Sequence, residues 1–406
     1  MASTSPKTWI VVPTYWTFPS GERGEEQTVF DHPTPLDEEG TLRRTLESFR
    51  VLDGEFAVLV VAACAHGDLG EATGRRVREL IAPLADDLRL YLVAPGDIGR
   101  LNGLLTRPIL ALDSYGNIRN VQLLVPFAAG AEVVIGIDDD EVIEDPAYLA
   151  KTLEFIGRDH RGETVSGMAG PYLDRGGQYR IAGAEALREH GNLFVMKNFH
   201  MNEALKGVME RPCPQGIVKS NVAFCGNMCM ARGMIGRVCH DPYIPRGEDY
   251  DYVINAAMSG LWFYFRPDMS VVHLPPDSTG SQAADKPSKL VADIRRFLYM
   301  REKHRYHAAH LPAEAMDIEY LMPYPGVYLD EGIDLAAHAV AALDELHPEF
   351  RQRQSPEALV AEATERARLK AAEFFVYRQR WRRTLEGLDG ACGLADAVRG
   401  LRIEGT

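Results

Sequence analysis

The amino-acid sequence predicts an α/β protein whose first half builds a mainly parallel sheet and whose C-terminal part is helical. Two observations predict this class. Short apolar runs alternate with amphipathic helical patterns through the first half of the chain, as they do in βαβ units. From about residue 284 onward the pattern becomes helical. A chain of 406 residues is long enough for one large α/β domain with an appendage, or for two domains.

In the first half, each predicted strand is a short apolar run, and each predicted helix places apolar residues at helical spacing. Leu42, Leu46 and Phe49 have this spacing, and Gly40 or Thr41 could begin their helix. The predicted strands cover residues 9–13, 56–63, 88–95 and 131–137. The predicted helices cover about 41–49, 72–84 and 117–130.

The middle of the chain, about residues 160–280, has a more mixed pattern. A helix is expected over 251–260, because Gly260 is a natural terminator. Strands or extended runs are expected at 167–173, 222–228, 261–267 and 270–275. The later helices are expected at 289–306, 334–346 and 356–388, with a Pro/Gly-rich connection at 320–332.

Composition and charge narrow the class of partner. A net charge of −14 argues against nucleic acid or an anionic membrane as the main partner, since both need a basic surface. No run reaches the roughly 18 to 20 apolar residues that span a bilayer. The N-terminus lacks the features of a signal peptide. A cytoplasmic protein without a transmembrane segment is therefore expected.

The six cysteines are scattered through the chain, which favours reduced thiols over a disulfide framework. Cys225, Cys229, Cys239 and His240 suggest a zinc site. Their spacing is not one of the known zinc-ligand patterns, so buried structural cysteines are the preferred interpretation.

Four consecutive carboxylates, residues 138–141, directly follow the predicted strand 131–137. Their mutual repulsion is costly unless a positive group lies among them. The carboxyl ends of strands form the edge of an open α/β sheet where ligands bind, which favours a functional role. The alternative is a solvated turn, with Asp145 and Pro146 capping the next helix.

Five further motifs occur in a recognisable order: P-T-Y at 13–15, R-N at 119–120, G-N at 226–227, E-D at 248–249 and V-V-H at 271–273. Together with the D-x-D of 138–140, they resemble family 2 glycosyltransferases and their relatives. The resemblance covers about residues 9–276. It implies the GT-A fold of nucleotide-diphospho-sugar transferases, a Rossmann-like mixed sheet flanked by helices, here with a helical C-terminal extension.

The resemblance also implies a domain division. Residues 1–283 would form the GT-A domain, with a nucleotide-binding part at about 9–150 and an acceptor part at about 160–283. Residues 284–406 would form the helical C-terminal extension, and residues beyond about 285 lie outside this resemblance. We expect this helical extension to shape the acceptor site or to form a homo-oligomer contact.

The implied activity is metal-dependent transfer of a hexose from a nucleoside-diphosphate sugar to a hydroxyl of a small molecule or glycan, with inversion. Asp138, Asp140 and His273 would hold Mg²⁺ or Mn²⁺, which prefer oxygen ligands. Asp139 would lie on the donor side, and Glu141 would be a bystander.

Glu248 and Asp249 are the implied catalytic pair, with Asp249 as general base and Asp251 as a possible substitute. The alternative is that these carboxylates only stabilise the N-terminus of a helix. Pro13, Thr14, Tyr15, Arg119 and Asn120 would contact the donor. Gly226, Asn227 and Arg246 would contact the acceptor, although arginines more often lie on the surface.

The sequence departs from the family pattern in two places. The aspartate pair expected after the second strand is absent, unless Asp68 replaces it, so the nucleobase is not predicted. A polar insertion at 17–36 would form a lid or a subunit contact. Three alternatives stay open: a retaining enzyme of the sugar-glycerate synthase type, a nucleotidyltransferase, and a non-catalytic sugar-binding subunit. The nucleotidyltransferase is disfavoured because no Gly-rich loop follows the first strand.

Overall fold

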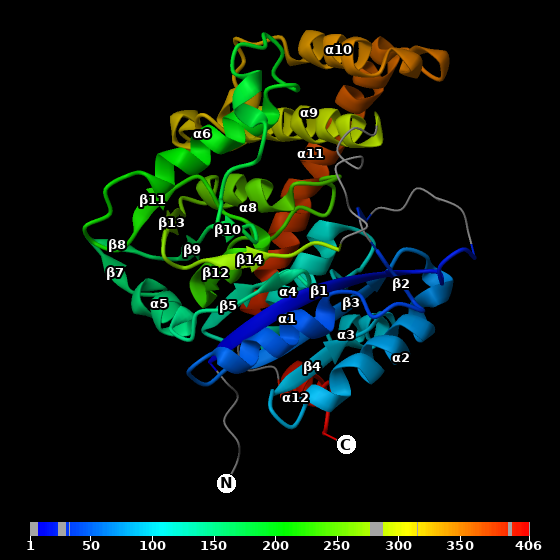
Figure 1. Ribbon diagram of the computed structural model, residues 1–406, viewed down its shortest axis with the longest axis vertical. Coiled ribbons are helices and arrows are strands. Elements are labelled where there is room, and N and C mark those ends of the chain that lie inside the picture. Colours follow the sequence, from blue (N-terminus) through cyan, green and yellow to red (C-terminus); the bar gives the residue numbers. More distant parts are fainter. Residues whose placement is uncertain are drawn as a thin grey trace.

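The computed structural model describes residues 7–22, 30–31, 33–276, 287–314, 316–388 and 392–405. Nine strands among these residues form one main sheet, in the order β11-β13-β9-β12-β5-β1-β3-β4, with β2 paired to β1 (Figure 1). The strands are β1 Thr8–Thr17, β2 Thr34–Pro35, β3 Ala57–Cys64, β4 Leu90–Val93, β5 Val133–Gly136, β9 Gly167–Ala169, β11 Val218–Ser220, β12 Met228–Ala231 and β13 Phe263–Phe265.

The sheet is mixed, as predicted. β1 runs parallel to β2, β3 and β5, and β3 runs parallel to β4. β12 is antiparallel to both β5 and β9. The strand or extended run expected over 222–228 is interrupted: Phe224 is extended, residues 225–227 form a 3-10 turn, and β12 begins only at Met228. Residue 226 in this turn has to be a glycine, because an added Cβ would lie 2.1 Å from the Glu141 carboxylate.

Helices cover both faces of the sheet and extend beyond it at the C-terminal end (Figure 1). One apolar cluster joins the sheet to α1, α2 and α5. A second, larger cluster joins the other face to α4, α8 and the helices α9 to α12. The helices are α1 Leu42–Ser48, α2 Gly70–Ile81, α3 Ile98–Gly103, α4 Tyr115–Ala128, α5 Tyr148–Phe155, α6 Lys197–Met209, α7 Arg232–Ile235, α8 Glu248–Ala257, α9 Pro287–His310, α10 Leu335–Leu346, α11 Pro356–Glu386 and α12 Cys392–Arg399.

The long C-terminal helix α11 packs against the sheet domain. Trp381 on α11 is fully buried, and its Nε1 donates a hydrogen bond to the Ile235 carbonyl at 2.8 Å. Tyr377 donates to the Ile109 carbonyl at 3.1 Å. After α12 the chain returns to the sheet edge, where the Ile403 amide donates to the Leu90 carbonyl at 2.9 Å. The expected boundary at 283/284 lies outside the described residues, and the division into domain and extension stays a prediction.

Two small sheets complete the fold. One, in the order β10-β14-β6, consists of β6 Glu141–Val142, β10 Tyr172–Leu173 and β14 Val271–His273. The other pairs β7 Asp159–His160 with β8 Glu163–Thr164. Within the described ranges, each helix is too short or too polar to cross a membrane. β6 begins at Glu141, the last of the four carboxylates at 138–141, a segment that we call the acidic turn.

Candidate active site

A cavity of about 560 Å³ opens where the acidic turn after β5 faces the N-terminus of α8. Its wall holds an acidic group around residues 138–140 and a group of cations, Lys197, Arg246 and Arg296, that we call the basic end of the cavity. Its lining includes Tyr15, Tyr115, Arg119, Asp138, Asp139, Asp140, Tyr172, Arg180, Lys197, Arg246, Glu248, Asp249, His273, Arg296 and Tyr324. The structure therefore brings most of the predicted site residues to one wall, although they come from segments far apart in the sequence.

The acidic turn is held from within by Glu141. The Glu141 side chain is fully buried, and its Oε2 accepts a hydrogen bond from the Asp138 amide at 3.0 Å. The Glu141 amide donates to the Asp138 carbonyl at 3.2 Å. Burial and the neighbouring Asp138 and Asp140 raise the pKa of Glu141 well above its ordinary value. Glu141 is thus not a lining residue, but it shapes the turn that presents the others.

The pairing of β6 with β14 brings the late histidine to the acidic turn. In this register His273 lies opposite Glu141. As a result His273 Nε2 is 3.2 Å from Asp140 Oδ2, and the Leu274 amide donates to the Asp140 carbonyl at 2.7 Å. Burial lowers the pKa of His273, but the hydrogen bond to Asp140 and the charges of Asp140 and Asp138 together raise it above its ordinary value.

Arg119, on α4, joins the two acidic segments. Its Nη2 donates to Asp138 Oδ1 at 2.6 Å, and its Nε donates to Glu248 Oε1 at 3.3 Å. The Arg119 side chain is only 7% exposed, so these contacts are shielded from water. The cation that the four carboxylates require is therefore supplied in part by the protein itself.

The residues of the E-D motif form the first turn of α8. This position also agrees with the alternative that these carboxylates stabilise the N-terminus of a helix. Gly247 before them has a φ of +70°, and a side chain there would place its Cβ 2.2 Å from Arg296 Nη1. Glu248 forms an ion pair with Arg119. Asp249 lines the cavity, and burial, together with Glu248, raises its pKa to about 7. A carboxylate with this pKa titrates in the range where a general base is most effective.

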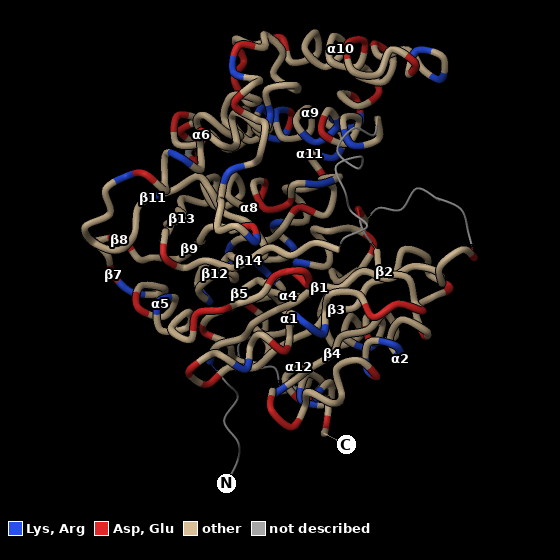
Figure 2. The backbone as a smooth tube through the Cα atoms, in the orientation of Figure 1, with Lys and Arg blue, Asp and Glu red and all other residues tan. Residues whose placement is uncertain are grey.

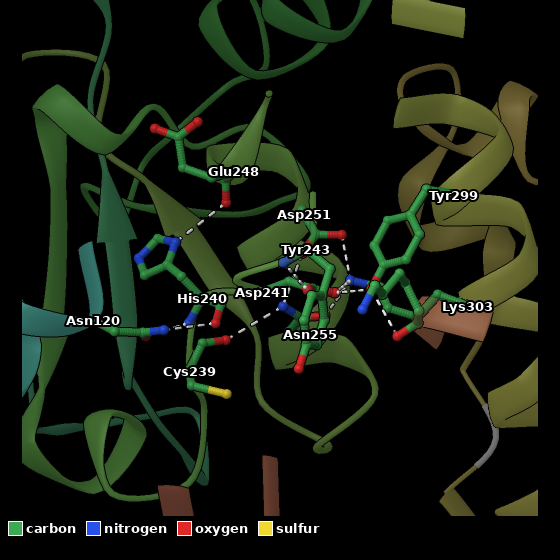
Figure 3. A network of polar contacts seen from close by, with 11 residues as sticks. Asn120, Cys239, His240, Asp241, Tyr243, Glu248, Asp251, Asn255, Tyr299 and Lys303 are labelled. Carbon is green, nitrogen blue, oxygen red and sulfur yellow. Dashed lines mark hydrogen bonds and ion pairs between the residues drawn. The ribbon is translucent and has the colours of Figure 1, made fainter. Parts of the chain in front are cut away.

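Asp251, the candidate substitute for the base, belongs to a buried network around Lys303 (Figure 3). Lys303 on α9 forms ion pairs with Asp251 and with Asp241, and it donates to Asn255 Oδ1 at 2.9 Å. All of Lys303, Asp241 and Asp251 have fully buried side chains. Burial raises the pKa of Asp251 to about 6, against the opposing effect of Lys303. Asp251 thus anchors α8 to the C-terminal helices. It is not among the described residues that line the cavity.

Several other predicted residues lie in the core. Asn120 donates to the His240 carbonyl at 2.9 Å and to the Tyr377 hydroxyl at 3.1 Å. Asn227 accepts from the Tyr148 hydroxyl at 2.6 Å and donates to the carbonyls of Pro171 and Met269. Neither asparagine is among the described residues of the cavity wall. Their contacts support the elements around the site.

The predicted donor segment 13–15 lies inside β1, which runs on to Thr17. Pro13 and Thr14 are buried, while Tyr15 reaches the cavity wall. Its ring is 4.7 Å from that of Phe30 and 5.3 Å from that of Tyr115, measured between centroids. Of the acceptor-side predictions, Arg246 lines the cavity, and the Gly226 amide donates to the Tyr172 hydroxyl at 2.7 Å. Asp68 is not among the described lining residues.

The predicted metal ligands do not form a complete metal site in this structure. Among the described residues, no three histidine, cysteine or acidic side chains are already arranged around a common metal position. This holds for the zinc candidates Cys225, Cys229, Cys239 and His240, and also for Asp138, Asp140 and His273. Asp140 and His273 do face one another in the cavity wall, whereas Asp138 is turned to Arg119. The pair supplies an oxygen and a nitrogen ligand, a set that fits Mn²⁺ or Mg²⁺ when a ligand provides the remaining oxygens.

Of the cations at the basic end of the cavity, the sequence predictions include only Arg246. Lys197 at the start of α6 and Arg296 on α9 also line it. In Figure 2 the acidic residues at 138–141 and at the start of α8 lie below the basic residues of α9. No sequence motif marks Lys197 or Arg296. The only available signal is that Arg296 lies on a predicted helix.

No protein-family model matches the chain, and no curated protein matches it. Similar solved structures include the mannosyltransferase PcManGT from Pyrobaculum calidifontis in complex with GDP-Man and Mn²⁺, at 16% identity and a TM-score of 0.44 over 96% of this chain and 87% of that one. Glucosyl-3-phosphoglycerate synthase from Mycobacterium tuberculosis, in complex with Mn²⁺, uridine diphosphate and phosphoglyceric acid, is also similar. The identity is 14% and the TM-score is 0.36, over 71% of this chain and 78% of that one. S. aureus TarS has an identity of 13% and a TM-score of 0.37, over 93% of this chain and 55% of that one. Identities this low do not transfer an activity from those proteins to this chain.

Proposed function

We propose that this chain is a metal-dependent glycosyltransferase of the GT-A type, which moves a sugar from a nucleoside-diphosphate sugar to a hydroxyl acceptor. One observation carries the proposal. A single cavity is lined by the acidic turn and His273 on one side and by the E-D segment of α8 on the other, with Arg119 between them. The motif order of the sequence supports the same activity.

At the donor end, Asp140 and His273 would hold Mn²⁺ or Mg²⁺, with Asp138 joining them if it leaves Arg119. The bound cation would neutralise the charge that develops on the departing diphosphate. Arg119 would remain close enough to compensate Asp138 or the diphosphate, because it already contacts the turn at 2.6 Å. The rings of Tyr15 and Tyr115 line the cavity, with buried Phe30 packed against both, and they offer aromatic surface for a nucleobase or sugar ring.

At the acceptor end, Asp249 would accept the proton of the attacking hydroxyl. The acceptor oxygen then forms a bond to the anomeric carbon while the bond from that carbon to the diphosphate oxygen breaks. The electron pair of the broken bond leaves with the diphosphate, and the sugar configuration inverts. Glu248 would hold Arg119 rather than act as the base, since it is engaged in that ion pair.

The test is a screen of nucleotide sugars with Mn²⁺ or Mg²⁺ that follows release of the nucleoside diphosphate. We expect at least one donor to be consumed only when metal is present. Proton NMR of the product then gives its stereochemistry. An anomer that matches the donor would remove the direct base role of Asp249 and favour the retaining sugar-glycerate type. Transfer of a nucleotide to a sugar phosphate would favour the nucleotidyltransferase instead.

A further inference from the structure

We propose that the acceptor carries an anionic group, a carboxylate or a phosphate, and that Lys197, Arg246 and Arg296 bind that group in the basic end of the cavity. The role of the neighbouring hydroxyl rests on the proposed function. The anion subsite itself can be tested without that function.

The three cations converge from three elements on one buried carboxylate. Lys197 Nζ is 2.7 Å from Asp293 Oδ2, and Arg296 Nε is 3.0 Å from Asp293 Oδ1. Arg246 Nε is 3.9 Å from Asp293 Oδ1. The three cations line the cavity, whereas Asp293 is not among the described lining residues. Asp293 balances one of the three positive charges, and Asp249, which lines the cavity, also acts on Arg296. Because burial and Glu248 raise the pKa of Asp249 to about 7, it carries only part of a negative charge near neutral pH, and surplus positive charge faces the cavity.

Two nearby acidic residues do not remove this surplus. Arg246 Nη2 lies 3.3 Å from Asp31 Oδ2, but the Asp31 side chain is 40% exposed, and ion pairs open to water are weak. Glu210 is occupied by Arg180, another cation of the cavity wall. The pair of Asp31 with Arg246 therefore lies at the rim and leaves the inner cations available.

The surplus charge is held in a partly dehydrated place. The side chains of Lys197 and Arg296 are 22% and 7% exposed. Burial lowers the pKa of Lys197, and Arg296 and Arg246 lower it further, against the effect of Asp293. Burial would raise the pKa of Asp293, but Arg296 and Lys197 hold it at about 2. Like charges gathered in this way cost free energy that a bound anion would recover, and guanidinium groups suit carboxylates and phosphates in particular.

The position of the cluster favours the acceptor over the donor. Arg296 lies directly behind Gly247, whose added Cβ would be 2.2 Å from its Nη1, and it lowers the pKa of Asp249 two residues further on. The acidic turn expected to receive the diphosphate has a different cation, Arg119. An acceptor held by its anionic group at the cluster would thus place its hydroxyl near Asp249.

Isothermal titration calorimetry of the full chain in EDTA tests the subsite. The probes are inorganic phosphate, sodium D-glycerate and glycerol, a neutral match to glycerate. Without metal the acidic turn repels anions, so binding reports on the basic end. We expect phosphate, glycerate or both to bind and glycerol not to bind. Which anion binds more tightly distinguishes a phosphate from a carboxylate.

Single variants make the test specific. Arg246→Gln and Lys197→Gln should each weaken anion binding by about tenfold or more, the loss of one charge-assisted hydrogen bond. Arg295→Gln is the matched control, since Arg295 is the exposed neighbour of Arg296 on α9 and is not a described lining residue. It should leave the affinity unchanged. Thermal melts of all three variants check that each is folded.

Three results would overturn the proposal. The first is no binding of either anion at concentrations up to about 20 mM, which corresponds to negligible affinity. The second is equal weakening by Arg295→Gln, which would reveal a non-specific charge effect. The third is displacement of bound phosphate by a nucleoside diphosphate with Mn²⁺, which would assign the cluster to the donor. Failure of the proposed glycosyl transfer would instead appear as an absence of donor consumption in the separate screen, whatever the calorimetry shows.

Discussion

At the scale of single residues, neighbouring carboxylates of this chain have different environments and hence different tasks. Glu248 is paired with Arg119. Asp251 is paired with Lys303 in the core. Asp249, between them, faces the cavity, and burial and Glu248 raise its pKa. Of these three carboxylates, only Asp249 combines access to the cavity with a pKa suited to proton transfer, which is why we assign it the role of base. Asp139 also lines the cavity, and burial with the neighbouring Asp140 raises its pKa to about 8, but it belongs to the acidic turn that we assign to the metal and donor.

Replacing this base is expected to affect the reaction and spare donor binding. Asp249→Asn should lower kcat by about 10²- to 10⁴-fold, the usual contribution of a positioned general base. Asp174→Asn is the matched control, because Asp174 also lines the cavity but its Oδ1 serves a turn, accepting from the Gly176 and Gln178 amides. Steady-state kinetics with the donor found in the screen would measure both. Equal activity of Asp249→Asn and wild type would exclude the assigned role.

The same residue predicts a pH dependence. Asp249 must be deprotonated to accept a proton, and its pKa is raised to about 7. Activity should therefore be lost as pH falls below about 7 and reach a plateau above it, in profiles of kcat/KM, which report on the free enzyme. The residual activity of Asp249→Asn should lack this limb. A wild-type profile that is flat between pH 5 and pH 8 would contradict the assignment.

At the scale of elements, the register of β6 with β14 and the contact of α9 with α8 build the site. The first brings His273 to Asp140, and the second fixes α8 through Lys303. The helix α9 contributes cations both to this buried network and to the cavity wall. The C-terminal helices therefore form part of the structure around the cavity.

Removing the buried cation should destabilise the whole chain. Lys303→Met leaves Asp241 and Asp251 buried without their partner, and breaking a buried ion pair in this way costs about 3–5 kcal/mol. Lys289→Met, at a half-buried position on the same helix, should change the free energy of unfolding by less than about 0.5 kcal/mol. Urea unfolding followed by circular dichroism compares the two. Equal stability of the variants would mean that the network does not anchor α8.

Elements and motifs were predictable to different degrees. The strands β1, β3, β4 and β5 were predictable because each is an apolar run buried on both faces of the sheet. The helix α6 was not, since only part of one face is buried and polar residues such as Asn202 interrupt the apolar pattern. The D-x-D, E-D and V-V-H motifs predicted most of the acidic residues that line the cavity, and also His273. The contacts of Lys303 and Arg296 depend on how α9 packs, which no local spacing reveals.

At the scale of the whole molecule, a nearly continuous core unites the sheet with the C-terminal helices on one face. The predicted role of those helices in a homo-oligomer stays a prediction. One feature supports it. Leu369 and Val376 on α11 are 64% and 51% exposed, and their spacing of seven residues places them on one side of the helix.

If α11 forms the subunit contact, charges on this side should break it. The double variant Leu369→Glu/Val376→Glu should shift the mass measured by light scattering from that of a dimer to 45.1 kDa, the mass of one chain. Both positions are exposed, so the melting temperature should hardly change. A wild-type mass of 45.1 kDa at all concentrations would end the oligomer prediction.

The central claim is that the acidic turn and His273 hold a metal ion together with a nucleoside diphosphate, and calorimetry of that ternary complex tests it most directly. UDP and GDP would be titrated into the protein with Mn²⁺ or with EDTA, for the wild type and for Asp140→Asn. We predict that one nucleotide binds only with Mn²⁺, and that Asp140→Asn weakens binding at least about tenfold, since a ligand oxygen is lost. Equal affinity in EDTA, or unchanged affinity of Asp140→Asn, would contradict the account.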